Sequence, residues 1–286
     1  MCLEFRNLLI GAALAAGLIA PGLVHADDAT PPRLYADSQL VTEGRFSDEI
    51  VGQGPDVIFI PGLASSRETW KATADRLKDR YRVHLIQLAG FAGEPARANA
   101  KGEVLVPTAE AIDGYLVQRH LAPATIVGHS LGGTIVLYLA ERHPADLKKA
   151  MMVDALPFYA SVFGGPNATV DSIKPMADAI RTGASKMNDQ QRQMMLASMA
   201  TAKADQDKIA AWGKASDDSA VDNALADDLM LDLRPDLAKI TTPITLLIPD
   251  YTSLGRPAGS TDAMYRGLYA AAAAHMTLVP VTNSRH

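Results

Sequence analysis

The alternation of strand-like and helix-like segments between residues 57 and 153 limits the fold more than any other feature of the sequence. Four apolar runs have the length and composition of buried strands: 57–60, 83–88, 124–127 and 151–153. Three amphipathic segments between these runs predict helices: 65–77, 108–119 and 134–142. Strands that alternate with helices form a mostly parallel, doubly wound sheet with helices on both faces. The sequence therefore predicts the α/β class.

This alternation stops after residue 156 and resumes near residue 243. In residues 157–237, Met, Ala, Gln and Asp recur at helical spacing, with breaks at three residues: Gly183, Gly213 and Pro235. We therefore expect three or four helices inserted between two strands of the sheet. Strands at 243–248 and 276–281 then flank a helix at 260–274. Upstream, residues 39–51 alternate weakly and predict antiparallel edge strands.

Composition and charge exclude several classes of protein. The chain has 286 residues, of which 48% are hydrophobic and 21% charged, and this balance argues against a disordered chain. A net charge of -5 argues against nucleic acid as a partner. The single cysteine, Cys2, excludes a disulfide framework and a cysteine-based zinc site. Since no phosphate loop or dinucleotide fingerprint occurs, the sequence implies no cofactor and no metal. It carries no signal for an oligomeric state.

Residues 1–26 have the pattern of a secretory signal peptide. An apolar run of twelve residues at 8–19 follows Arg6, and Val24 and Ala26 stand at positions -3 and -1 of a cleavage site. The run is shorter than the roughly 20 residues that span a bilayer. We therefore expect cleavage before Asp27, no stable membrane insertion afterwards, and a periplasmic or secreted protein. An uncleaved membrane anchor is the alternative.

The most specific motif of the sequence is GHSLGG at 128–133. It follows a predicted strand and precedes a predicted helix, which is the context that the G-x-S-x-G nucleophile turn requires. The turn is too tight for side chains at Gly128 and Gly132, and it presents the hydroxyl of Ser130 above the sheet. Ser130 is therefore the candidate nucleophile. The alternative is an ordinary glycine-rich turn with a capping serine.

A serine that attacks an acyl group needs two backbone N–H donors for the oxyanion that develops. Leu131, directly after the nucleophile, is in position to supply one of them. We assign the other to Leu63, in the turn that follows the strand at 57–60.

At this point the chain resembles the α/β-hydrolase family. Four segments carry the resemblance: IPGLASS (60–66), GHSLGG (128–133), PITLLIPD (243–250) and NSRH (283–286). The resemblance implies two core segments at 27–156 and 238–286, with a helical cap at 157–237. It also implies a triad in the order serine, acid, histidine. Two features depart from the common pattern: Pro61 replaces a frequent His, and QLAGFAG (87–93) replaces a D-x-x-G-x-G-x-S loop.

Seven histidines occur, and one of them fits the general base of this triad. His286 alone follows the last predicted strand, on the carboxyl side where ligands bind in such sheets. His129 neighbours the nucleophile, but we expect its side chain to point away from Ser130. His286 is also the final residue, whereas family members usually continue with a helix. We therefore expect a truncated chain whose triad is poorly held.

Two aspartates compete for the acid of the triad. Asp250 directly follows the strand at 243–248, which is the usual place, and is the first choice. Asp154 follows the strand at 151–153 and is the alternative acid. Asp262 lies near a helix start, where capping is the expected role.

The predicted cap is rich in methionine, with six residues: Met176, Met187, Met194, Met195, Met199 and Met230. Flexible thioethers suit an adaptable apolar pocket, so a small lipophilic acyl or ester substrate is one interpretation. Packing of the cap onto the core is the other. The pairs at 217–218 and 227–228 are interpreted as solvated faces or helix ends.

The function predicted first is a secreted or periplasmic serine hydrolase that cleaves a carboxylic ester or a related acyl bond through a Ser-His-Asp triad and an acyl-enzyme. Carbon–carbon bond hydrolysis, thioester hydrolysis and cofactor-free perhydrolysis use the same triad and stay open. Epoxide hydrolases and dehalogenases are disfavoured because they use Asp at the position of Ser130. The second class is a non-catalytic binding protein or truncated inactive form, and the third is a membrane-tethered protein.

Overall fold

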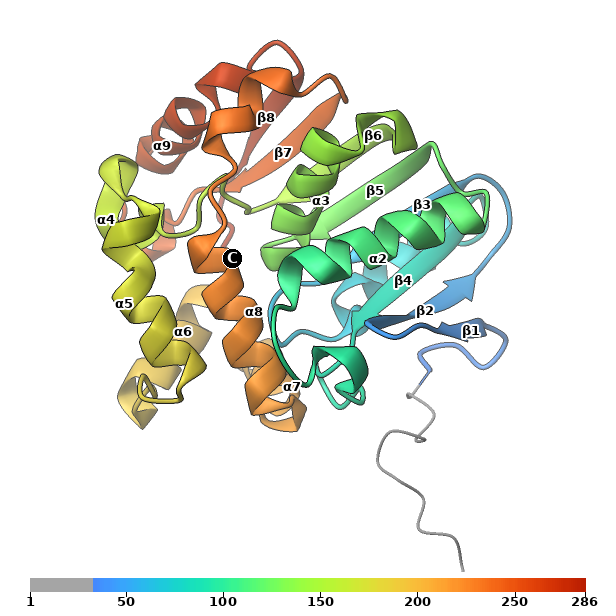
Figure 1. Cartoon of the computed structure of the whole chain (residues 1–286), viewed down its shortest axis with the longest axis horizontal. Helices are drawn as coiled ribbons and strands as arrows, with labels where there is room; N and C mark the ends of the chain where they lie inside the picture. The colour runs from blue at the N-terminus through green and yellow to red at the C-terminus, as the bar shows by residue number, and fades with distance from the viewer. Residues whose placement is uncertain (1–32) are drawn as a thin grey trace, which may run out of the picture.

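The computed structural model describes residues 33–286, so the signal peptide predicted at 1–26 lies outside the described residues. Eight strands form one sheet in the order β1-β2-β4-β3-β5-β6-β7-β8 (Figure 1). Their bounds are β1 Gln39–Thr42, β2 Phe46–Val51, β3 Asp56–Ile60, β4 Arg82–Leu88, β5 Ala124–His129, β6 Leu147–Val153, β7 Ile244–Pro249 and β8 Met276–Val281. The pairs from β4 to β8 are parallel, whereas β2 runs antiparallel to β1 and β4. The predicted α/β class and the antiparallel edge strands are both confirmed.

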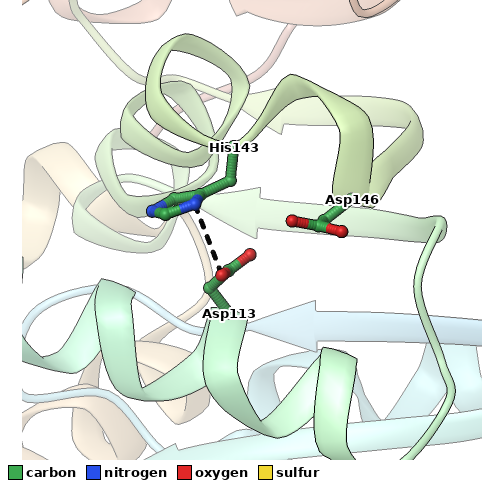
Figure 2. A group of neighbouring side chains, drawn as sticks. All are labelled: Asp113, His143 and Asp146. Atoms are coloured by element: carbon green, nitrogen blue, oxygen red, sulfur yellow. Dashed lines mark ion pairs between the residues drawn. The ribbon is translucent and has the colours of Figure 1, made fainter.

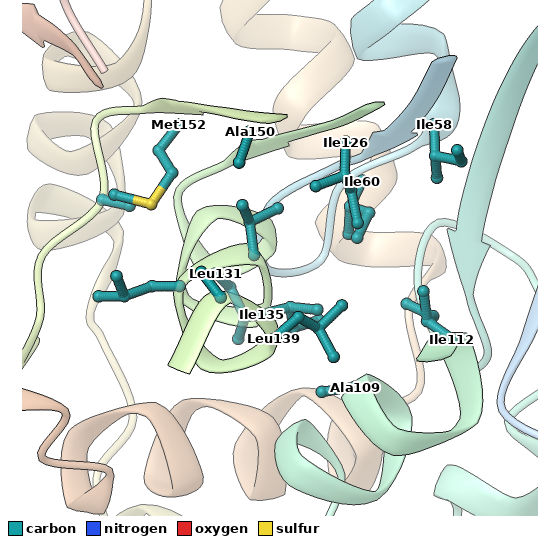
Figure 3. Packing of buried hydrophobic residues seen from close by; sticks show 14 of the residues in the cluster. Ile58, Ile60, Ala109, Ile112, Ile126, Leu131, Ile135, Leu139, Ala150 and Met152 are labelled. Atoms are coloured by element: carbon teal, nitrogen blue, oxygen red, sulfur yellow. The ribbon is translucent and has the colours of Figure 1, made fainter. Parts of the chain in front are cut away.

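Four helices border the sheet, and the central strands β3 and β5 are apolar because both of their faces are covered. The helices are α1 Lys71–Leu77, α2 Leu105–Gln118, α3 Leu131–Arg142 and α9 Ser260–Leu268. Ile58 and Ile60 of β3 belong to the apolar cluster that contains α2 and α3 (Figure 3). Phe59, between them, points to the opposite face and packs with Trp70, next to α1. Each such side chain contributes about 1.5–3 kcal/mol when it is fully buried.

The predicted insertion of helices lies between β6 and β7, next to the sheet (Figure 1). It contains five helices, one more than the upper expectation: α4 Ser161–Gly164, α5 Val170–Arg181, α6 Asp189–Met199, α7 Lys203–Ala215 and α8 Asp218–Met230. Gly183 lies just after α5 with a φ of 67°, as a predicted break should. The break predicted at Gly213 is wrong. A helix tolerates one glycine at a cost of about 1 kcal/mol, and Gly213 lies inside α7.

The insertion has a small core of its own and is tied to the sheet through α8. Ile173 and Ile180 of α5 pack with Leu229 of α8. The carboxylate of Asp227 accepts hydrogen bonds from the backbone N–H groups of Val104 at 2.6 Å and Leu105 at 3.1 Å. These donors lie at the start of α2, where a carboxylate interacts favourably with the helix dipole. The position of α8 is therefore fixed against the sheet domain.

Buried polar residues explain why the alternation at 39–51 is weak. Asp48 and Glu49 of β2 are fully buried, although they are charged residues. His84 of β4 lies between two carboxylates, with Nδ1 2.6 Å from Asp48 and Nε2 3.0 Å from Asp56. The hydroxyl of Tyr115 also donates to Asp48, at 2.8 Å. These hydrogen bonds provide partners for a charged side chain of β2 inside the protein. The strand is therefore buried although its sequence lacks a strongly apolar pattern.

None of the helices within residues 33–286 has both the length and the apolar character needed to cross a membrane.

Candidate active site

Ser130 occupies a sharp turn between the end of β5 and the start of α3. Its φ of 52° and ψ of -124° lie in a backbone region that residues other than glycine rarely adopt. A Cβ atom on Gly128 would lie 2.1 Å from the carbonyl oxygen of Gly132, and one on Gly132 would lie 2.5 Å from that of Ile60. Only glycine fits at both positions, which accounts for the spacing of the motif.

His286 connects Ser130 to a carboxylate. Its Nε2 atom lies 2.9 Å from Oγ of Ser130, and its Nδ1 atom lies 2.5 Å from Oδ2 of Asp154. The three residues follow the carboxyl ends of β5, β6 and β8, which lie at one edge of the parallel sheet. The structure thus brings together two of the three predicted triad residues and the alternative acid.

Asp154 is a buried carboxylate held in its ionised form. The hydroxyls of Tyr251 and Tyr265 both donate to it, in addition to His286. Burial alone would raise its pKa, but the hydrogen bond and charge of His286 and the two hydroxyls lower the pKa of Asp154 to about 2. At neutral pH it can therefore orient the imidazole of His286 and stabilise a positive charge on that ring.

The first choice for the acid, Asp250, does not contact His286 in this structure. Its carboxylate accepts hydrogen bonds from the backbone N–H and the hydroxyl of Thr252, both at 3.1 Å, and from the N–H of Asn283 at 2.8 Å. Asp250 lies at the predicted edge of the sheet, but these donors hold its carboxylate in the turn after β7. The structure therefore favours Asp154 over Asp250 as the partner of His286.

His129 lies against the triad rather than pointing away from it. Its ring centroid is 4.7 Å from that of His286, and the planes are inclined by 47°. Burial, and to a smaller extent the neighbouring imidazole, lower the pKa of His129 to about 3. The ring is therefore uncharged near neutral pH, so it adds no second positive charge beside His286.

Two backbone donors are available beside the nucleophile. Leu63 and Leu131 line the same cavity as Ser130. Within residues 33–286, neither backbone N–H donates a hydrogen bond to another backbone or side-chain oxygen. Leu131 is also the first residue of α3, where the helix dipole favours negative charge. Both residues predicted as oxyanion donors therefore line the cavity that contains Ser130.

A cavity of about 220 Å³ lies above Ser130 and His286. The inserted helices supply its outer wall, through Met199 of α6, Asp205, Lys208, Ile209 and Trp212 of α7, and Leu225 and Asp228 of α8. Most of these side chains are apolar. Three of the methionines considered for the pocket, Met176, Met187 and Met194, are instead exposed.

Asp228 is a member of the site that the sequence did not reveal. The pair 227–228 was expected at a solvated face or helix end, yet Asp227 binds the start of α2 and Asp228 is 6% exposed. The sequence offers one weak signal: Leu225, Asp228 and Leu229 share a helix face at three- and four-residue spacing.

Three possible metal ligands come together elsewhere, at the far end of α3. Among residues 33–286, Asp113, His143 and Asp146 place one ligand atom each within 4.8 Å of one another (Figure 2). Both nitrogens of His143 already face carboxylates, with Nδ1 3.4 Å from Asp113 and Nε2 3.1 Å from Glu110. Because α3 is about 18 Å long, the group is remote from Ser130. These contacts describe an ion-pair cluster.

Similar proteins of known sequence include esterases. The chain is 32% identical over 133 residues to the pimeloyl-[acyl-carrier protein] methyl ester esterase of Chromobacterium violaceum, covering 46% of this chain and 50% of that protein. A protein of the same name from Nitrosomonas europaea is 24% identical over 229 residues, covering 77% of this chain and 86% of that protein. The first of these matches thus spans about half the length of the relative.

Similar solved structures share the fold at low sequence identity. The enol-lactonase from Burkholderia xenovorans matches with a TM-score of 0.66 and 18% identity, covering 84% of this chain and 89% of that chain. An esterase from Exiguobacterium antarcticum matches with a TM-score of 0.62 and 21% identity, covering 82% of this chain and 86% of that one.

The family model described as "alpha/beta hydrolase fold" matches residues 55–198, about half of the chain. The matched residues run from β3 to the end of α6 and include Ser130 and Asp154. The sheet order, the turn at Ser130 and this match agree. The chain therefore belongs to the alpha/beta hydrolase fold family.

Proposed function

We propose that the chain hydrolyses a carboxylic ester, with Ser130 as nucleophile, His286 as general base and Asp154 as the acid that orients the base. The observation that supports this most strongly is the continuous set of contacts from Asp154 through His286 to Ser130. Nucleophile, base and orienting carboxylate in this order are the arrangement that acyl transfer through serine requires.

The proposed reaction has two stages. His286 Nε2 takes the proton of Ser130 Oγ as the oxygen attacks the ester carbonyl. The N–H groups of Leu63 and Leu131 stabilise the oxyanion, and the protonated His286 then gives its proton to the departing alcohol. In the second stage, His286 takes a proton from the water that attacks the acyl-enzyme. It returns this proton to Ser130 Oγ as the bond between that oxygen and the acyl group breaks and the carboxylic acid leaves.

One observation supports an ester as the bond that is cleaved, and a second supports a small substrate. The relatives named above are pimeloyl-[acyl-carrier protein] methyl ester esterases, and the match to the Nitrosomonas europaea protein covers 77% of this chain, enough to include Ser130. The cavity of about 220 Å³ is smaller than the roughly 300–1,000 Å³ of most ligand pockets. We therefore propose a small lipophilic ester, whose apolar part packs against Trp212, Ile209 and Leu225.

We also propose that α4–α8 act as a cap over the site. The inserted helices supply the outer wall of the cavity. An ion pair of 2.9 Å between Lys208 of α7 and Glu68 connects the cap to the segment after β3. Because solvent screens exposed ion pairs, this pair is weak and can open to admit substrate.

The pattern at residues 1–26 supports a further proposal, that the protein is exported to the periplasm or beyond the cell. Cell fractionation and intact mass of the protein produced with residues 1–286 test it. We expect a mature chain that begins at Asp27. A cytoplasmic protein that retains Met1 would contradict export and leave the catalytic proposal untouched.

Hydrolysis of p-nitrophenyl esters of increasing acyl length tests the catalytic proposal. We expect turnover of acetate and butyrate esters, much less turnover of a dodecanoate ester, and loss of turnover in Ser130→Ala. If no ester is cleaved by folded protein, or if Ser130→Ala keeps full activity, the proposal is wrong.

A further inference from the structure

The cavity beside Ser130 contains one buried carboxyl group that the proposed reaction does not use. Asp228 is 6% exposed and lines the cavity together with Ser130 and His286. Its Oδ1 atom is buried and has no hydrogen-bond partner. Among residues 33–286, no lysine, arginine or histidine forms an ion pair with it. Buried polar atoms almost always have a partner, so this one requires an explanation.

The fold itself does not explain this carboxyl group. Its neighbour Asp227 satisfies the backbone at the start of α2 and pairs with Arg181 at 2.7 Å, which is a clear structural role. The hydroxyl of Thr134 lies beside the carboxyl group of Asp228, but Oδ1 of Asp228 stays without a partner. A buried acceptor without a partner destabilises the protein. A ligand group that enters the cavity is able to supply the missing partner.

The position of Asp228 brings it close to the reacting atoms. Its carboxyl group lies beside Thr134, which is four residues after Ser130 and thus one turn along α3. Asp228 and Ser130 also line the same small cavity, so a partner group of Asp228 would lie within one small molecule of the reacting carbonyl. A small ester can carry a polar group at that separation.

The charge state of Asp228 limits the kind of partner. Burial raises its pKa to about 7; the Thr134 hydroxyl opposes this rise, and the charge of Asp227 adds to it. Near neutral pH the group therefore exists both as an acid and as a carboxylate. A hydroxyl group both donates and accepts, so it fits either form. An ammonium group fits only the carboxylate.

We propose that Asp228 binds a hydroxyl group of the substrate, so that the enzyme prefers esters that carry a hydroxyl near the scissile bond. This proposal rests on the ester hydrolysis proposed above and names the substrate class of that site. Asp228 is then a specificity-determining residue. A site built to bond a hydroxyl discriminates strongly against an analogue that lacks it, because the buried acceptor stays unpaired.

Two pairs of esters of matched shape test the preference on both sides of the ester bond. For the acyl side, p-nitrophenyl 3-hydroxybutanoate is compared with p-nitrophenyl 3-methylbutanoate. For the alcohol side, 3-hydroxypropyl butanoate is compared with butyl butanoate. In each pair a hydroxyl replaces a methyl group. We expect kcat/KM to favour the hydroxyl ester by about tenfold or more in at least one pair.

Variants assign that preference to Asp228. We expect Asp228→Leu to bring the ratio close to one. Asp228→Asn, which keeps a carbonyl acceptor, should retain part of the preference and guards against a misfolded Leu variant. Asp218→Asn is the matched control, since Asp218 is an exposed residue of the same helix. A preference that survives in Asp228→Leu would overturn the proposal.

Binding to Ser130→Ala, measured by calorimetry with the same ester pairs, separates this proposal from the proposed hydrolysis. If Ser130→Ala binds a hydroxyl ester more tightly than its matched partner, and the double variant Ser130→Ala/Asp228→Leu does not, the role of Asp228 is supported even if turnover failed. Equal binding and equal kcat/KM within both pairs would refute that role while the ester hydrolysis stands. Stronger binding of a matched 3-aminopropyl ester than of the 3-hydroxypropyl ester would also overturn it, in favour of an ammonium group.

Discussion

The Nδ1 atom of His286 lies 2.5 Å from Oδ2 of Asp154, a residue that follows β6 and not β7. The hydroxyls of Tyr251 and Tyr265 contact the same carboxylate. Tyr251 directly follows Asp250, the acid expected first, and Tyr265 lies in α9. The chain after β7 thus supplies hydrogen-bond donors to Asp154, while Asp250 makes no contact with His286.

This arrangement predicts opposite results for two substitutions of aspartate by asparagine. Asp154→Asn should lower kcat by about 10³–10⁴-fold, because the imidazole of His286 loses the group that fixes its tautomer. Asp250→Asn should lower kcat by less than about tenfold, since Asp250 is bonded to Thr252 and Asn283. Steady-state kinetics on a short-chain ester measure both. A greater loss in Asp250→Asn would restore the first choice.

The ionised Asp154 should also make the protein sensitive to acid. Its folded pKa of about 2 lies below the unfolded value of about 3.9, so its stabilisation is present above about pH 4 and is lost as pH falls toward 2. The difference corresponds to a free energy of unfolding on the order of 2 kcal/mol. Tyr265→Phe removes one donor and should raise the pKa of Asp154. Urea unfolding between pH 2 and 6 should show a shallower pH dependence in this variant, and an unchanged one would contradict the assignment.

A second, opposite pH dependence is expected from His84. Burial disfavours its charged form, but the hydrogen bonds and charges of Asp48 and Asp56 outweigh burial and raise the pKa of His84. Its stabilisation is therefore present below about pH 6.5 and is lost as pH rises through the folded pKa. Urea unfolding between pH 5.5 and 9 should show this loss in the wild type and in the exposed-site control His275→Gln. His84→Gln should lack it; the same slope in all three proteins would exclude His84 as the cause.

Arg285 should act as a positioning residue for the base. Its guanidinium donates to the carbonyl oxygens of Ala197 and Ala200 at the end of α6, and its Nε lies 3.2 Å from Oγ of Ser253. Loss of these bonds frees the residue next to His286, and a displacement of about 1 Å lowers rates by about 100-fold. We expect Arg285→Ala to lower kcat with little change in KM. Arg192→Ala, on the exposed face of α6, is the control and should behave as wild type.

The sequence predicted the sheet and the sharp turn at Ser130 well because both depend on local patterns. Apolar runs such as 57–60 are buried on both faces, so their composition alone indicates strands. The motif at Ser130 is recognisable because Gly128 and Gly132 are required by close backbone contacts. His286 follows from its place after the last strand.

The acid and Asp228 depend on contacts that no local pattern reveals. Asp154 and Asp250 both follow parallel strands at the same edge, and the hydrogen bonds of distant residues decide which one reaches His286. Asp228 is polar and stands next to Asp227, so it resembles a solvated pair. Ala220 and Ala224 are buried in the main core, and their burial fixes α8 over the cavity. This packing of α8 determines the environment of Asp228.

Labelling with a fluorophosphonate, read as the intact mass of the protein, tests most directly whether Ser130 is an activated nucleophile. The contacts from Asp154 through His286 to Ser130 predict a single adduct in the wild type, none in Ser130→Ala, and much slower labelling in Asp154→Asn than in Asp250→Asn. A folded wild-type chain that stays unlabelled, or an adduct that persists in Ser130→Ala, would contradict the account.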